Sequence, residues 1–313
     1  MPLTHFPYGV ASFNFPLIGS GPWNSIEAIK QNPAQVFFVS VTGDNGMEGT
    51  SPSTAFRDIQ KAVDKCTSSV GAFVFLGEGR WQEQVIITQR GLHLIGMGPY
   101  RTQIQAPSGG SAVMTAFSGF YPLVAATPLV GNGFGVEIAN MRLGGNGGYP
   151  GVYLGDGAVS GNASGSSVHG CLIDGSNLEG NYGVLLYGGS FMDVYDNLIV
   201  NQLLGGVYCS SGAIRTLYGN LIRNNNIIGC KGNGVTLTGV CNDNLIRENA
   251  FLDSSSGALT NGILGTGSTG TKNGAVGNYF CTAGTKINMV AGDYASGNYA
   301  AQAGNAAQFV TTA

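Results

Sequence analysis

A short motif recurs through the second half of the chain, in which a small polar residue is followed two places later by an apolar one. The marked positions of the copies are Asn140, Cys171, Asn197, Asn225, Asn249 and Asn278. They are spaced by 31, 26, 28, 24 and 29 residues, and a glycine that opens an alternating apolar run follows most copies, as in GVTL at 234–237. Repeats of variable length, built from short alternating strands with Gly- and Asn-rich turns, predict a β-solenoid.

The physics of a solenoid explains the marker residues. A single coil cannot bury its inner face alone, so it stacks on neighbours about 4.8 Å away. The marked residues would then form a ladder, in which amide side chains hydrogen-bond from coil to coil at a sharp bend. Charged residues make up only 10% of the 313 residues, as expected where like charges one coil apart repel. Two alternative folds fit less well. A leucine-rich repeat would have a tighter period and a leucine pattern, and the strands of a β-sandwich would share no common marker.

Composition excludes several other classes of protein. The 52 glycines show no Gly-X-Y period, and 11 prolines are too few for collagen. A net charge of −3 provides no basic footprint for nucleic acid. No segment of 18 apolar residues predicts membrane insertion. The six cysteines lack CxxC pairs and adjacent histidines, so we expect no zinc and interpret them as buried, reduced thiols of a protein folded in a cytoplasm.

The first half contains one clear helix pattern, within GTSPSTAFRDIQKAVDKC. Ser51 is in the N-cap position and Pro52 in the first helical position. Apolar residues then follow with a spacing of 3, 4 and 3, at Phe56, Ile59, Val63 and Cys66. Four short strand patterns come next, at 72–76, 84–87, 92–96 and 103–106. We expect a helix at about 52–66 that caps the open end of the solenoid core.

This opening resembles a known superfamily. The matching segments are FFVSV (37–41), GDNGMEGTSPSTAF (43–56), AVDKC (62–66) and GLHLIGMG (91–98). They are similar to the right-handed parallel β-helix proteins of the pectate-lyase-like superfamily, and with the repeats the resemblance covers about residues 36–292. It implies an all-β fold, a right-handed single-stranded parallel β-helix with an N-terminal capping helix and an extended N-terminal arm. The same scaffold carries enzymes, adhesins and viral spikes, so the resemblance leaves the function open.

The sequence matches few of the catalytic motifs found in the enzymes of this superfamily. Pectate lyases use clustered acidic calcium ligands and an arginine base, whereas polygalacturonases combine three aspartates with a histidine motif. VHG at 168–170 makes His169 similar to that histidine, but no Asp-Asp pair or Asn-Thr-Asp accompanies it. We interpret His169 as a residue of a loop or strand edge.

Glycoside hydrolysis needs two carboxyl groups roughly 5–9 Å apart, which neighbouring coils could supply. The candidates are Asp174, Asp196 and Glu248, with Arg223 and Arg247 as aligned partners. The simpler interpretation is that these acids cap turns or face solvent, and that Glu248 bridges the two arginines. We therefore favour a protein that is not an enzyme, and we expect no metal and no cofactor.

The two ends of the chain differ from the repeats. Residues 1–35 form an extended aromatic arm with Phe6, Tyr8, Phe13, Phe15 and Trp23, and an arm of this kind predicts docking onto a partner. Its first residues, PLTHFPYGVASF, resemble the starts of virion proteins of tailed bacteriophages. No export signal is recognised, because no Lys or Arg precedes the apolar part. Residues 293–313 are expected to cap the last coil or to contact another subunit.

These observations converge on a virion structural protein of a tailed bacteriophage, a capsid decoration or a tail spike or fibre. We expect assembly in the host cytoplasm, a homotrimer, attachment to other virion proteins through residues 1–35, and adhesion of the β-helix to a host-surface polysaccharide. One alternative is a polysaccharide-degrading glycosidase or lyase of the tailspike type. The other is a bacterial surface adhesin.

Overall fold

The computed structural model describes residues 35–67, 71–107, 113–115, 135–146, 148–155, 163–175, 181–211, 216–254, 257–302 and 305–310. The aromatic residues of the predicted docking arm, Phe6, Tyr8, Phe13, Phe15 and Trp23, lie outside these ranges.

About half of the described residues lie in short strands, which form four sheets. Sheet A contains β1 (Val36–Val39), β2 (Ala72–Leu76), β5 (Leu92–Ile95), β8 (Glu137–Ala139), β11 (Ser167–His169), β15 (Asp193–Tyr195), β19 (Leu221–Arg223), β23 (Leu245–Arg247), β26 (Gly274–Val276) and β29 (Tyr294–Ser296). Sheet B contains β3 (Gly79–Gln82), β6 (Thr102–Gln105), β9 (Arg142–Gly144), β12 (Leu172–Asp174), β16 (Leu198–Val200), β20 (Asn226–Ile228), β24 (Ala250–Leu252), β27 (Tyr279–Cys281), β30 (Asn298–Gln302) and β31 (Asn305–Val310).

Two further sheets complete the coils. Sheet C contains β4 (Val85–Ile87), β7 (Val113–Thr115), β10 (Val152–Gly155), β13 (Tyr182–Tyr187), β17 (Gly205–Ser210), β21 (Asn233–Gly239), β25 (Asn261–Ser268) and β28 (Thr285–Asn288). The small sheet D contains β14 (Gly189–Ser190), β18 (Leu217–Tyr218) and β22 (Cys241–Asn242).

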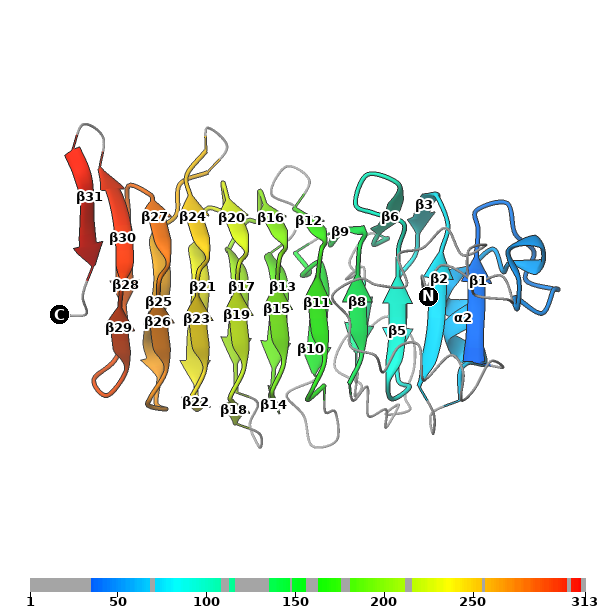
Figure 1. Cartoon of the computed structure of the whole chain (residues 1–313), viewed down its shortest axis with the longest axis horizontal. Helices are drawn as coiled ribbons and strands as arrows, with labels where there is room; N and C mark the ends of the chain where they lie inside the picture. The colour runs from blue at the N-terminus through cyan, green and yellow to red at the C-terminus, as the bar shows by residue number, and fades with distance from the viewer. Residues whose placement is uncertain are drawn as a thin grey trace, which may run out of the picture.

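The chain winds through these sheets in a fixed order, so that successive coils lie side by side along the long axis (Figure 1). Strands of neighbouring coils pair in parallel, and among the described strands only β30 and β31 are antiparallel. This is a parallel β-helix, and the predicted fold class is confirmed. Beyond the predicted boundary at residue 292, β29 and β30 add a further coil to sheets A and B. They continue the β-helix because Ala295 packs against the core and Ala300 is buried in it.

The interior consists of columns of apolar side chains, which each sheet contributes from its inner face. In sheet A, for example, Val168, Val194, Ile222 and Ile246 occupy one register position in consecutive coils and are all buried. In sheet B the rings of Phe251 and Phe280 stack with their centroids 4.9 Å apart. Strands buried on one face by such columns need alternating apolar residues, which is the pattern that the sequence shows.

The predicted capping helix begins later than expected. Ser51 precedes a 3-10 helix, Pro52–Thr54, and the α-helix α2 spans only Ile59–Lys65. Between them, Phe56 forms a parallel bridge with Val39, and this extended pairing interrupts the helix. The four predicted apolar residues, Phe56, Ile59, Val63 and Cys66, are nevertheless all buried. The prediction was therefore correct for the buried residues and wrong for the helix start.

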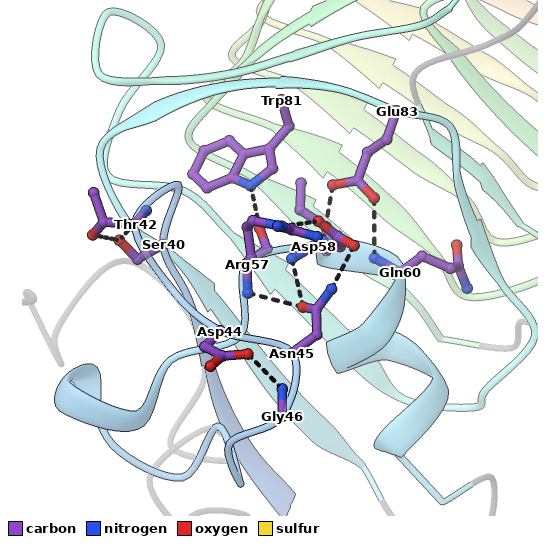
Figure 2. Close-up of polar contacts among 11 residues, drawn as sticks. Ser40, Thr42, Asp44, Asn45, Gly46, Arg57, Asp58, Gln60, Trp81 and Glu83 are labelled. Atoms are coloured by element: carbon purple, nitrogen blue, oxygen red, sulfur yellow. Dashed lines mark hydrogen bonds and ion pairs between the residues drawn. The ribbon is translucent and has the colours of Figure 1, made fainter.

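Side chains from three segments hold α2 in place (Figure 2). The Glu83 carboxylate accepts hydrogen bonds from the backbone N–H of Ile59 at 2.8 Å and of Gln60 at 3.3 Å, which satisfies two free donors of the helix N-terminus. The Gln60 side chain in turn exchanges two hydrogen bonds with the backbone of Ile86 in β4. The Oδ1 atom of Asn45 accepts from the N–H of Asp58 at 3.0 Å. These bonds fasten the cap to the first coils.

A stack of buried side chains runs along the bend between sheets A and B. Each Asn donates from Nδ2 to a carbonyl of the preceding coil, and its Oδ1 accepts from the backbone N–H of the marker residue in that coil. The stack contains Cys171, Asn197, Asn225, Asn249, Asn278 and Asn298.

The predicted marker Asn140 is not part of this stack. Asn140 is exposed, and its backbone has a φ of 59°. Arg142 pairs with Leu172, which directly follows the marker Cys171, so the buried Met141 occupies the ladder position. In the other copies the apolar residue two places after the marker points inward. Arg142 points outward, so the marker of this copy was assigned one residue too early in the sequence.

A second stack, which the marker motif did not predict, lies at the bend before sheet A. Asn220, Asn244 and Asn273 bond from coil to coil, with Nδ2 to Oδ1 distances of 2.8 and 2.9 Å, and the stack ends on Asp293. Two of its members begin the NLIR copies at 220–223 and 244–247. The bends before and after sheet A are therefore both closed by side-chain amides where the backbone leaves the sheet.

The predicted burial of the cysteines holds for five of the six. Cys66, Cys171, Cys209, Cys230 and Cys241 are buried free thiols, whereas Cys281 is exposed because it lies on the outer face of β27. Burial raises the pKa of Cys171 to about 12, so this thiol stays protonated and unreactive. No helix in the described part of the chain is long and apolar enough to cross a membrane.

Candidate functional site

The structure does not bring the three candidate carboxylates together. Asp174 lies on the outer face of β12 and forms an ion pair with Arg142, with 2.5 Å between Oδ2 and Nη2. Asp196 and Glu248 lie in the turn between sheets A and B, exposed and with φ of 54° and 55°. They lie in equivalent turns of coils that are two apart, so roughly 10 Å separates their backbones. The three residues do not form a catalytic pair.

Another constellation stands on the outer face of sheet A, and His169 belongs to it. Strand register places His93, Glu137, Ser167 and Asp193 in one outward column and His169, Tyr195, Arg223 and Arg247 in the next. Below, the sheet-A strip denotes His93, Glu137, His169, Asp193, Tyr195, Arg223 and Arg247. It extends over the sheet-A strands β5, β8, β11, β15, β19 and β23, which follow one another along the long axis in Figure 1.

At one end of the strip, Glu137 is held between two imidazoles. Its Oε2 lies 2.5 Å from Nδ1 of His93, and its Oε1 lies 2.7 Å from Nε2 of His169. Burial would raise the pKa of Glu137, but hydrogen bonds from His169 and His93, together with their charges, outweigh burial and hold this pKa at about 2. Glu137 is therefore an ionised carboxylate over the ordinary pH range.

Aromatic stacking continues the strip through the next two coils. The rings of His169 and Tyr195 stack with their centroids 4.6 Å apart, and the guanidinium carbon of Arg223 lies 4.1 Å from the centre of the Tyr195 ring. Burial, followed by the negative charges of Asp193 and Glu137, raises the pKa of Tyr195 to about 12. Its hydroxyl therefore remains a hydrogen-bond donor. The rings face one another along the axis, so the strip presents ring edges and polar atoms outward.

The other end of the strip is rich in arginine. Nη2 of Arg223 lies 2.9 Å from Oδ2 of Asp193, so the expected bridge from Glu248 is wrong for Arg223. Asp193 lies on the same sheet face as Arg223, whereas Glu248 projects from the turn. Burial raises the pKa of Asp193, which the bond from Arg223 only partly offsets. Within the described residues, Oδ1 of Asp193 and Nε of Arg247 are buried without a hydrogen-bond partner.

We expect the Glu137 cluster to make stability depend on acid pH. The pKa of Glu137 falls from its usual 4.5 to about 2 on folding, so its contribution of about 3 kcal/mol is complete above pH 4.5 and is lost as the pH falls towards 2. Urea unfolding of the wild type and of Glu137→Gln should therefore differ by about this amount at pH 5 and converge near pH 2. A gap between the two proteins that does not change with pH would contradict this interpretation.

Most residues of the strip were missed from sequence, and one signal could have found them. The strand before each marker has three residues, of which the first and third face outward. Aligning these strands on the marker puts His169, Tyr195 and Arg223 in one column. The partner of His169 is harder to find, because Glu137 precedes the copy in which the marker was displaced.

Comparison with solved structures shows the fold. The chain is similar to pectin methylesterase from carrot, with 10% identity over 85% of this chain and 82% of that chain and a TM-score of 0.54. It is similar to pectin methylesterase PemA from Erwinia chrysanthemi, with 10% identity over 86% and 90% and a TM-score of 0.51. A more distant likeness is to the tailspike gp49 of Acinetobacter baumannii bacteriophage Fri1, a capsular polysaccharide depolymerase, with 12% identity over 83% and 42% and a TM-score of 0.47.

Comparison with sequences adds one partial match. The family model described as periplasmic copper-binding protein (NosD) matches residues 152–303, just under half of the chain. No curated protein sequence is significantly similar. Copper sites use clustered His, Cys or Met ligands, but His169 is the one histidine of the matched segment and its Nε2 is bound to Glu137. No three His, Cys, Asp or Glu side chains of the described chain converge as metal ligands. The residues of the described part of the chain therefore do not fit a copper site.

Proposed function

We propose that this protein is a structural component of a bacteriophage virion, whose projecting β-helix binds a host-surface glycan along the sheet-A strip. The observation that carries the proposal is the strip itself, a line of hydrogen-bonding groups across six consecutive strands of a rigid sheet. In the proposed particle, residues 1–35 attach the β-helix to other virion proteins. Deleting them should leave a folded β-helix that is no longer incorporated.

The geometry of the strip suits an extended polysaccharide. Successive coils present equivalent positions about 4.8 Å apart, which is close to the length of one pyranose unit along a stretched glycan chain. Sugars are recognised by placed hydrogen-bond donors and acceptors, and the strip offers imidazole, phenol, carboxylate and guanidinium groups. These groups already hold one another in position, so little conformational entropy is lost when a ligand binds.

The proposal predicts binding that depends on the centre of the strip. On an array of bacterial surface polysaccharides, Tyr195→Ala should weaken binding at least tenfold, because it removes the ring on which His169 and Arg223 stack. The matched control is Tyr279→Ala, an exposed tyrosine on the outer face of sheet B, which should bind as the wild type does. Equal binding by Tyr195→Ala and the wild type, with both folded by circular dichroism, would reject the strip as the binding surface.

One observation favours a second candidate, the cleavage of a bound polysaccharide. The pKa of Glu137 is lowered while that of Asp193 is raised, and opposite shifts of two carboxyl groups are typical of an acid and a base. The register places them two coils apart, roughly 10 Å between backbones, near the upper limit for an inverting glycosidase. Oligosaccharide release in the same assay, abolished by Asp193→Asn, would establish this activity. Binding without release would leave the protein an adhesin.

A further inference from the structure

We propose that the ligand of the sheet-A strip is an acidic saccharide, whose carboxylate, sulfate or phosphate group binds Arg247 beside Arg223. This inference rests on the proposed glycan binding and adds the charge class of the glycan. Its basis is the arginine end of the strip.

The strand register places two arginines side by side. Arg223 and Arg247 are directly paired in the parallel strands β19 and β23, so their side chains emerge about 4.8 Å apart on the same face. Like charges placed opposite one another in a sheet are destabilising. Such a pair needs compensating negative charge, from the protein or from a ligand.

The protein supplies one carboxylate, Asp193, to this pair of arginines, and its charge acts on both of them. Asp193 is bound to Arg223, whose guanidinium also lies over the Tyr195 ring. No carboxylate of the described chain lies within ion-pair distance of Arg247, although Glu248 is its neighbour in sequence. The next coil along the same column contributes Val276, which has no charge. One positive charge therefore remains at this end of the strip.

Arg247 also has a hydrogen-bond donor that the protein leaves unsatisfied. Nε of Arg247 is buried without a hydrogen-bond partner among the described residues, and the side chain as a whole is partly buried. An unpaired buried donor is destabilising, and an oxyanion that accepts from a guanidinium edge relieves this cost. Arginine binds carboxylate and phosphate-type oxyanions through two parallel hydrogen bonds, which a single neutral sugar hydroxyl cannot form. The chemistry of this position therefore selects an anionic group.

The test compares acidic with neutral polymers. The probes are polygalacturonate, alginate, hyaluronate and polysialic acid, with dextran and pullulan as neutral polymers, titrated by calorimetry into the full-length protein. At least one acidic polymer should bind, more weakly as salt is raised. Arg247→Gln should weaken that binding at least tenfold, and Arg247→Lys should fall between, because lysine keeps the charge and loses the paired hydrogen bonds. The matched control, Arg101→Gln, removes an exposed arginine from the connection between β5 and β6 and should have no effect.

The outcomes separate this inference from the proposed function. Binding of an acidic polymer that survives Arg247→Gln would overturn the inference. So would binding of neutral polymers alone; if that binding were lost in Tyr195→Ala, glycan recognition by the strip would still stand. No binding of any polymer, here or on the polysaccharide array, would reject both.

Discussion

Asn225→Ala is expected to lower the free energy of unfolding by about 3–5 kcal/mol. The Asn225 side chain makes four hydrogen bonds, accepting from N and Nδ2 of Asn197 and donating to the Val194 carbonyl and to Oδ1 of Asn249. Alanine makes none of them, and the buried N–H of Asn197 is left without its Oδ1 acceptor. An unsatisfied buried donor costs roughly 1–3 kcal/mol, and each further hydrogen bond that is lost costs about 1 kcal/mol.

The adjacent residue provides a matched control for this prediction. Asn226 is exposed on the outer face of β20, so Asn226→Ala should change stability by no more than about 0.5 kcal/mol. Urea unfolding followed by circular dichroism measures both variants. If Asn225→Ala were as stable as Asn226→Ala, the stacked amides would not stabilise the bend.

Gly234→Ala is expected to destabilise the β-helix by about 3 kcal/mol or more. An added Cβ would lie 2.3 Å from Cδ1 of Phe251 and 2.5 Å from the Gly262 carbonyl oxygen, so a buried ring and the next coil would both have to move. The same arrangement recurs in sheet C, where the Cβ would meet an inward residue of sheet B at Gly151, Gly183, Gly206, Gly234 and Gly262. Glycine at these positions lets the two sheets approach closely.

A second glycine in the same sheet tests the explanation. Gly265 is buried in β25, but an added Cβ there would meet Met289 at 3.3 Å, and a flexible methionine can give way. Gly265→Ala should therefore cost much less than Gly234→Ala in thermal or urea unfolding. Equal losses would mean that glycine acts through backbone freedom rather than through space.

The local repeat made the fold predictable. Asn197, Asn225, Asn249 and Asn278 each precede a residue that points outward and then one that points inward, and this alternation alone determines the face of the strand. The same alternation failed at Asn140 because Arg142 stands where an inward residue was expected. The helix start failed for another reason: Ser51 and Pro52 form a valid start signal, but pairing of Phe56 with Val39 overrides it.

The candidate site was far less predictable. Glu137 is 32 residues from His169 and 44 from His93, so their contact depends on the lengths of two whole coils. The choice of Asp174, Asp196 and Glu248 rested on residue type, whereas their positions in the coil place them on a different sheet or in a turn. His169 was recognised as a candidate, but its partners emerge only when the coils are stacked in register.

The sheet-A strip is tested most directly by a crystal structure of the protein with a bound oligosaccharide from a polysaccharide that it recognises. We expect the sugar chain to lie along the outer face of sheet A, over Tyr195, with an acidic group at Arg247. A sugar chain bound to the outer face of sheet B or sheet C, with the sheet-A strip bare, would contradict this expectation.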